Sequence, residues 1–147
     1  MDMAGRSFTF VSGAGSPLSG HLEPPEGTPR GWAIFAHCFT CGKDSRAAVH
    51  ISRALSRAGI GVLRFDFAGT GIGGGTGEPV NFASDVEDLR AAANAMAAAG
   101  MSPSLLVGHS LGGTAAIVAA ADMPDIAAVA TIGAPADLQH ILRLFGP

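Results

Sequence analysis

The sequence predicts an α/β protein: a mostly parallel sheet with helices on both faces and an antiparallel hairpin at its N-terminus. Two observations predict this class. After an opening hairpin, apolar runs alternate with segments of helical periodicity, which is typical of parallel strands joined by helices. The apolar runs are continuous, as in strands that are buried on both faces. These runs lie at Gly31–His37, Gly61–Phe67 and Ile126–Ala134.

Length and composition indicate one globular domain. The 147 residues, 48% of them hydrophobic, suffice for a single domain over 1–147 with a real core. The net charge of −3 is spread over mixed acidic and basic residues with no basic run, which argues against nucleic-acid binding. No apolar run is long enough to span a membrane, and no N-terminal signal stands out. We therefore expect a soluble, cytoplasmic protein that binds neither nucleic acid nor membrane.

The N-terminal elements follow from local patterns. Arg6–Val11 alternates polar and apolar side chains, as an edge strand does, and Leu18–Glu23 is expected to pair with it as an antiparallel hairpin. Ser45–Ala58 has helical periodicity and is closed by Gly59. The predicted inner face of that helix holds Ala48, Ile51, Leu55 and Ala58.

The C-terminal elements begin with a long helix, capped by Asn81 and running to about Ala99. Its predicted inner stripe holds Val86, Leu89, Ala93 and either Met96 or Ala97. Acidic residues near its N-terminus suit the helix dipole, and they are Asp85, Glu87 and Asp88. The remaining predicted elements are a strand at Leu105–Gly108, a helix at Ser110–Ala121, the strand at Ile126–Ala134 and a short helix at Asp137–Phe145.

A Gly-x-Ser-x-Gly turn joins the strand before Gly108 to the alanine-rich helix after Ser110. Strand, sharp turn and helix with a serine at the apex are the context of a nucleophile elbow. Glycines two before and two after the serine keep side chains out of the turn, and the hydroxyl then stands at a helix N-terminus. The alternative is a glycine-rich turn that happens to hold a serine. The flanking strand and helix favour the elbow.

Three segments together resemble the α/β-hydrolase superfamily of serine esterases: Phe35-Ala36-His37, Arg64-Phe65-Asp66-Phe67 and the elbow. The similarity runs from about Arg6 to the chain end. Residues 35–44 and 130–137 further resemble the hydrolase domain of proteins that also carry an OsmC-like domain, which this chain lacks. The resemblance implies that Ser110 is the nucleophile, that small carboxylic esters are the substrates, and that neither cofactor nor metal is needed.

The resemblance also implies where the oxyanion hole lies. One donor is the N–H of Leu111, the residue after the nucleophile, and the second comes from the loop after Gly31–His37. The family has His-Gly and an apolar donor residue there, whereas this chain reads His37-Cys38-Phe39. Phe39 is therefore the candidate for the second donor, and His37 is expected to be structural, as in the family.

Two further motifs admit other readings. Cys38 and Cys41 form a Cys-x-x-Cys, for which a redox pair or a zinc site is the alternative to two partly buried thiols in a loop. We favour the thiols, because the spacing alone is a weak signal. Residues 69–74 match Gly-x-Gly-x-x-Gly, but the next helix does not begin inside the motif as a dinucleotide site requires. We favour a glycine-rich loop.

The rest of a catalytic triad is missing from its usual place. The family has an acid and then a histidine on later loops, and the candidates after Ser110 are Asp122, Asp125, Asp137 and His140. Asp137 and His140 lie three residues apart on a predicted helix and do not easily bracket Ser110, so we favour an exposed His140. Three possibilities stay open: part of a longer hydrolase, an impaired hydrolase or binding module, or an enzyme whose base is His140 or comes from a partner chain.

The family also has two more strands after Ile126–Ala134, so the fold is expected to be truncated after this strand. That leaves an apolar, buried-type strand at a sheet edge, which invites pairing with another chain. We expect a homodimer joined through strand 126–134.

Overall fold

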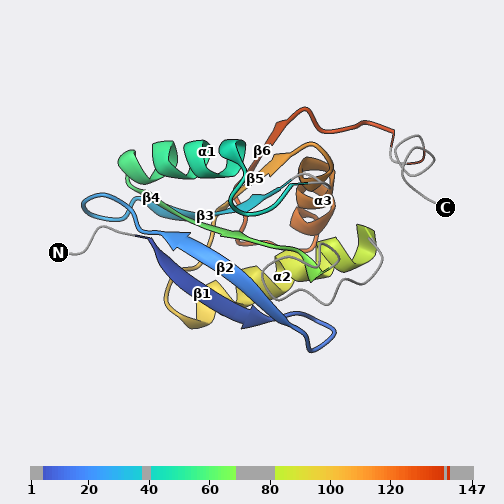
Figure 1. Cartoon of the computed structure of the whole chain (residues 1–147), viewed down its shortest axis with the longest axis horizontal. Helices are drawn as coiled ribbons and strands as arrows, with labels where there is room; N and C mark the ends of the chain where they lie inside the picture. Colours follow the sequence, from blue (N-terminus) through green and yellow to red (C-terminus); the bar gives the residue numbers. More distant parts are fainter. Residues whose placement is uncertain (1–4, 38–40, 69–81, 138, 140–147) are drawn as a thin grey trace.

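The computed structural model describes residues 5–37, 41–68, 82–137 and 139, and it confirms the predicted α/β class (Figure 1). None of the described helices is long and apolar enough to cross a membrane. The described elements are, in chain order, β1 (Arg6–Val11), β2 (Pro17–Glu23), β3 (Gly31–Ala36), α1 (Arg46–Arg57), β4 (Ile60–Phe65), α2 (Phe82–Ala98), β5 (Leu105–His109), α3 (Leu111–Ala120) and β6 (Ala128–Ile132).

The strands form one mixed sheet in the order β1-β2-β4-β3-β5-β6. The predicted hairpin is confirmed, because β1 pairs antiparallel with β2, and β2 pairs antiparallel with β4. The remaining neighbours, β4, β3, β5 and β6, are all parallel. The carboxyl ends of β4, β3, β5 and β6 therefore meet at one edge of the sheet, where ligands bind in open α/β folds.

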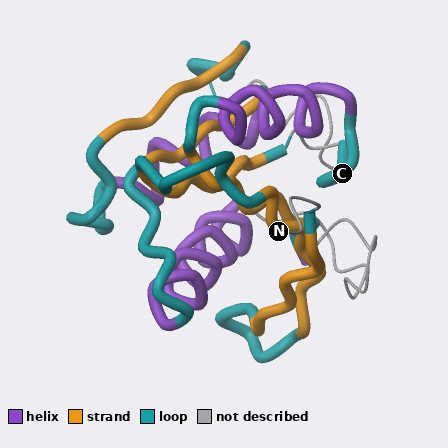
Figure 2. The backbone as a smooth tube through the Cα atoms, turned by 90° about the vertical axis from the view of Figure 1, so that its left-hand side faces the viewer, coloured by secondary structure: helices purple, strands orange, loops and turns teal. Residues whose placement is uncertain are grey.

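Both faces of the parallel strands are covered, as their continuous apolar sequences predict. Ala33 and Phe35 of β3 pack with Ala48 of α1, whereas Ile34 and Ala36 belong to the cluster under α2 and α3. This alternation follows from the two-residue period of a strand. Figure 2 shows helices on both sides of the strands.

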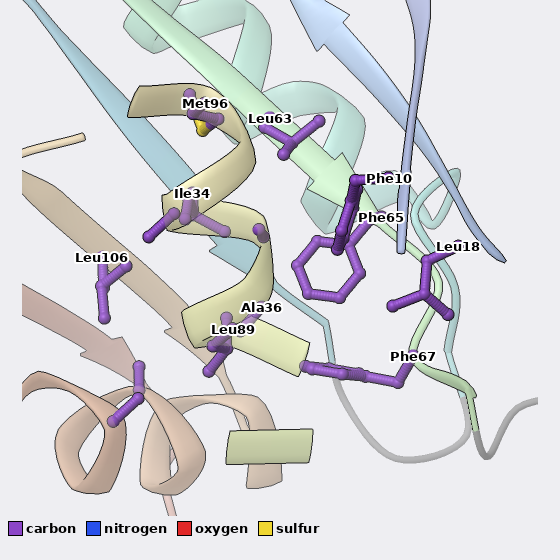
Figure 3. Close-up of a cluster of buried hydrophobic side chains, with 14 of the residues drawn as sticks. Phe10, Leu18, Ile34, Ala36, Leu63, Phe65, Phe67, Leu89, Met96 and Leu106 are labelled. Carbon is purple, nitrogen blue, oxygen red and sulfur yellow. The ribbon is translucent and has the colours of Figure 1, made fainter. Parts of the chain in front are cut away.

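The larger core lies between the sheet, α2 and α3 (Figure 3). The ring of Phe65 meets Phe10 edge-on at 5.1 Å between centroids, so the hairpin and the parallel strands share one core. The predicted inner stripe of α2 is confirmed, and Met96 completes it, since Ala97 is exposed. The stripe consists of Val86, Leu89, Ala93 and Met96.

Helix α1 departs in part from its predicted inner face. Ser45 caps it, accepting a hydrogen bond from the N–H of Ala48. Ala58 was expected on the inner face, but it is exposed at the C-cap. Ser52 and Ser56 are buried in addition to Ala48. The Ser56 hydroxyl donates to the Pro24 carbonyl at 2.6 Å, and this hydrogen bond offsets the cost of burying the hydroxyl.

The strand predicted over Ile126–Ala134 is shorter than expected, and its apolar run is not buried, because it lies at a sheet edge, as the expected truncation after this strand implies. The strand runs only over Ala128–Ile132, and four of its five residues are exposed. Strand β6 pairs with β5 on one side and is the last strand of the described sheet (Figure 1). The predicted cap Asn81 lies outside the described residues, as does most of the predicted helix Asp137–Phe145.

Candidate active site

Ser110 stands where β5 ends and α3 begins, in a backbone conformation that L-residues rarely adopt. Its φ is 55° and its ψ is −125°, and among the described residues it alone combines a side chain with a positive φ. Such a conformation costs about 1–3 kcal/mol and persists only where surrounding structure enforces it. Here the Ser110 N–H donates to the Ile132 carbonyl at 2.8 Å, and the Ser110 carbonyl accepts from the Gly113 N–H at 2.9 Å.

The glycines around Ser110 are required by close backbone contacts. A Cβ on Gly108 would lie 2.3 Å from the Cα of Gly113, and one on Gly112 would lie 2.3 Å from the carbonyl oxygen of Ala36. Side chains cannot occupy these positions without moving β5, α3 or β3 apart. The need for Gly108 and Gly112 was predicted from the motif, whereas the contact with Gly113 is visible only in the structure.

The first of the two predicted oxyanion donors lies at a suitable place. Leu111 is the first residue of α3, so its N–H has no acceptor within the helix and lies at the positive end of the helix dipole. Because Gly112 lies against the carbonyls of Ala36 and His37, this helix end is next to the loop that follows β3. Phe39, the second predicted donor, lies outside the described residues and stays a prediction.

His37 has the surroundings of a structural residue, as the family resemblance implies. Its side chain is only 2% exposed. The Nε2 atom accepts a hydrogen bond from the N–H of Phe67 at 3.4 Å, and the two rings meet edge-on with centroids 4.8 Å apart. His37 therefore ties the end of β3 to the residues that follow β4.

A network of charged side chains connects the residues just before α1 with the end of β4. The Lys43 N–H donates to Asp66 Oδ1 at 2.8 Å, and Lys43 Nζ lies 3.6 Å from Asp66 Oδ2 and 2.7 Å from Asp44 Oδ2. Arg64, buried on β4, pairs with Glu23 at 3.0 Å and with Asp44 at 3.7 Å. Arg64 and Asp66 are charged residues at the end of an apolar run, and this could have marked them as functional or structural. The sequence pattern does not show which loop they contact.

The network stabilises the charged forms of the Lys43 and Asp44 side chains. A hydrogen bond to Asp44 raises the pKa of Lys43 above its ordinary value, against an opposing effect of burial, and Asp66 adds to the rise. The same hydrogen bond from Lys43 lowers the pKa of Asp44. Both partners are therefore ionised at neutral pH.

The interpretation of the Cys-x-x-Cys as two thiols is wrong for Cys41. Cys41 is disulfide-bonded, and Cys38 is the one other cysteine of the chain. Within the described ranges, no group of three or more histidine, cysteine, aspartate or glutamate side chains is placed to hold a metal ion. The Gly-x-Gly-x-x-Gly at 69–74 lies outside the described residues.

Of the candidate triad acids, the topology brings one to the edge where Ser110 lies. Asp122 and Asp125 precede β6, so they lie at the amino end of the parallel strands, and Asp122 pairs there with Arg90 at 2.6 Å. Asp137 follows β6 and is exposed at the carboxyl end, as Ser110 is after β5. His140 lies outside the described residues.

Two buried acids of α2 were expected to serve only the helix dipole. Asp88 is 2% exposed, and its Oδ2 accepts a hydrogen bond from the N–H of Ala68 at 3.1 Å. Asp85 is 7% exposed. Burial, and to a lesser extent the neighbouring charge of Asp88, raise the pKa of Asp85 to about 7. The Asp88 carboxyl therefore ties α2 to the segment after β4.

Comparison with known proteins agrees with this geometry. The family model described as serine aminopeptidase, S33, matches residues 27–145. The esterase domain of a Rhodothermus marinus protein is 45% identical over 95% of this chain, with a TM-score of 0.77, and the match covers 54% of that domain. No curated protein gives a significant match.

More distant solved structures share the fold. The α/β hydrolase GrgF from a Penicillium species is 23% identical, with a TM-score of 0.82, and the match covers 96% of this chain and 52% of GrgF. Est1E from Butyrivibrio proteoclasticus, solved with ferulic acid, is 24% identical, with a TM-score of 0.79, over 93% and 56% of the two chains. The chain thus spans about half the length of these relatives. It belongs to the serine aminopeptidase S33 family of α/β-hydrolases.

Proposed function

We propose that the protein is a serine hydrolase that acts on small carboxylic esters through an acyl-enzyme on Ser110. The observation that carries this proposal is the strained backbone of Ser110, which β6 and the first turn of α3 hold at the carboxyl edge of the sheet. A backbone outlier that its surroundings enforce is typical of a functional site. The esterase domain at 45% identity supports the same chemistry.

In this mechanism the Ser110 hydroxyl loses its proton to a base as its oxygen attacks the ester carbonyl. The carbonyl oxygen becomes an oxyanion, which accepts hydrogen bonds from the N–H groups of Leu111 and Phe39. Collapse of the tetrahedral intermediate expels the alcohol, which takes up the proton, and leaves the acyl group on Ser110. Water then releases the acid by the same steps. We assign the base to a histidine, which is His140, a histidine of a partner chain or, where the chain is part of a longer hydrolase, a histidine outside the given sequence.

Hydrolysis of p-nitrophenyl acetate tests the proposal. Ser110→Ala should lower kcat/KM by about a thousandfold or more, because nucleophile and base act as a unit. Ser102→Ala is the matched control. Ser102 is an exposed serine before β5, so it lies at the amino end of the parallel strands, whereas Ser110 lies at their carboxyl end. Equal rates for Ser110→Ala and Ser102→Ala would reject Ser110 as the nucleophile. His140→Ala should abolish turnover if His140 is the base and leave it intact if a partner chain supplies it.

The second candidate function is a hydrolase-like binding module that lacks the triad. The position of the candidate triad acids favours it. Among the described residues, only Asp137 of these candidates lies at the carboxyl end of the strands, where Ser110 lies. A wild-type protein that neither turns over nitrophenyl esters nor reacts with a fluorophosphonate would support this module over the enzyme.

We also propose that a second copy of the chain pairs with β6. Strand β6 ends the described sheet and exposes four of its five residues. Of the four large apolar side chains exposed in the described residues, three lie on α3 and β6: Ile117, Val118 and Ile132. Unpaired strand edges and exposed apolar patches mark association sites.

Light scattering after gel filtration at micromolar concentration measures this association. The wild type should run as a dimer, and Ile132→Lys should run as a monomer, because a charge on an edge strand blocks pairing. Val11→Lys is the control, since Val11 is equally apolar and 61% exposed but lies on β1, at the opposite sheet edge. A monomeric wild type would contradict the proposal.

A further inference from the structure

The outer face of α1 carries a straight row of basic side chains. The row consists of four exposed residues at intervals of four, three and four positions: Arg46, His50, Arg53 and Arg57. At about 100° of rotation per residue, these positions fall within about 60° of one another around the helix axis. Ala48 faces the sheet, where it packs with Phe35, so the row faces away from the sheet (Figure 1). We call this row the basic stripe.

The basic stripe has no acidic partner in its own helix or elsewhere in the part of the chain that the structure describes. Helix α1 contains no aspartate and no glutamate. The nearest acid in sequence, Asp44, pairs with Lys43 and Arg64. The other ion pairs between described residues also leave the stripe out. At the C-terminal end of α1, Arg30 adds a further cation, because its guanidinium donates to the Ala58 carbonyl at 3.1 Å.

The stability of α1 does not explain the stripe. Like charges four residues apart on a helix repel each other, and Arg53 and Arg57 are such a pair. A cation in the first turn also opposes the helix dipole, as Arg46 does. Arg57 suits the dipole because it lies in the last turn, but this accounts for one position of the row. A row of exposed cations that the helix does not need is better explained by a partner of opposite charge.

The chemistry of the stripe favours a protein partner over a membrane or a nucleic acid. Its three permanent cations are arginines, which pair with carboxylates through two parallel hydrogen bonds and are enriched at protein interfaces, where lysine is depleted. Helix α1 exposes no large apolar side chain that could insert into a bilayer. The net charge of −3 for the whole chain argues against a nucleic acid.

The intervals of the stripe favour an acidic helix as the partner. A rise of about 1.5 Å per residue places the four side chains about 6, 4.5 and 6 Å apart along the axis. Acidic residues at the same positions of a neighbouring helix repeat these intervals. Side chains on one face of a strand recur at about 6.7 Å and lose the register. We propose that the outer face of α1 docks a helix of a partner protein that carries acidic residues at this spacing. This interaction is separate from ester hydrolysis and does not depend on it.

Two synthetic peptides of equal composition test the proposal with the whole chain. Both are alanine-rich helices with four glutamates, which follow intervals of four, three and four residues in the first peptide and are spread around the helix in the second. Binding is followed by the chemical shifts of backbone amides at low salt, because exposed charge pairs are individually weak and are screened by salt. The first peptide should bind about fivefold more tightly than the second and shift the amides of α1 rather than those of α2.

Single charge reversals locate the contact. Arg53→Glu should weaken binding of the first peptide about tenfold, because it removes one attraction and adds one repulsion. Arg6→Glu is the matched control, since Arg6 is exposed on β1 and its reversal changes the net charge equally. This control should keep the affinity within about twofold of the wild type. Arg46→Glu should weaken binding without lowering the urea midpoint, because an acid in the first turn suits the helix dipole.

Equal affinities of the two peptides for the wild type would overturn the proposal, and so would equal losses in Arg53→Glu and Arg6→Glu. Phosphatidylserine vesicles and a single-stranded oligonucleotide are tested in the same way. If either of them shifts the amides of α1 and the first peptide does not, the partner is not an acidic helix and the proposal is wrong.

Discussion

Replacing Ser110 should reverse the usual order of stability between alanine and glycine. At φ 55° and ψ −125°, alanine keeps the strain of the native serine, whereas glycine adopts this conformation freely. We therefore expect Ser110→Gly to be more stable than Ser110→Ala. In an ordinary helix the opposite holds, and glycine is about 1 kcal/mol worse than alanine.

The magnitude follows from two opposing effects. Relief of the backbone strain stabilises the glycine variant by about 1–3 kcal/mol. The greater freedom of glycine in the unfolded chain destabilises it by about 0.4–1 kcal/mol. The expected net difference is about 1 kcal/mol in favour of Ser110→Gly.

Urea unfolding followed by the fluorescence of Trp32, the single tryptophan, measures this difference. Ala54→Gly is the control, because Ala54 is exposed in the middle of α1 and should lose about 1 kcal/mol. If Ser110→Ala unfolds at the same or a higher urea concentration than Ser110→Gly, the elbow is not strained and the reasoning is refuted.

Two further predictions concern stability. Gly108→Ala should destabilise the protein by about 3 kcal/mol or more, because its Cβ would lie 2.3 Å from the Gly113 Cα. Gly13→Ala, whose Cβ meets no atom nearer than 3.8 Å, should change the urea midpoint little, and equal midpoints would contradict the packing argument. Between pH 4 and pH 7, folded Asp85 keeps its proton and unfolded Asp85 has lost it, because burial raises its folded pKa to about 7. Stability should therefore fall with rising pH by up to about 1.4 kcal/mol per unit, and Asp85→Asn should remove this component; parallel pH curves for the two proteins would refute it.

The parts of the fold that local periodicity specifies could be predicted. Continuous apolar runs predicted the parallel strands, alternation in Arg6–Val11 predicted the edge strand, and helical periodicity predicted α1 and α2. The edge position of strand 126–134 was expected from the truncated family fold and not from its own sequence, because an apolar run shows that a strand can be buried and not whether a neighbour covers it. β6 has the sequence of a central strand and the exposure of an edge strand.

Part of the candidate site could also be predicted from the sequence, and part could not. A motif of fixed spacing contains Ser110 and its glycines, so its strained turn could be expected from the sequence alone. The contact between Lys43 and Asp66 joins residues that are 23 positions apart through a backbone N–H, and no residue type signals such a contact. The bonded state of Cys41 was not predicted either, because the Cys-x-x-Cys spacing is compatible with free thiols as well as with a disulfide.

The most direct test of the central claim, that Ser110 is the nucleophile, is the mass of the protein after reaction with a fluorophosphonate. We expect one covalent adduct per chain, located on Ser110 by peptide fragmentation and absent from Ser110→Ala. An unmodified wild type, or an adduct of equal yield on Ser110→Ala, would contradict it.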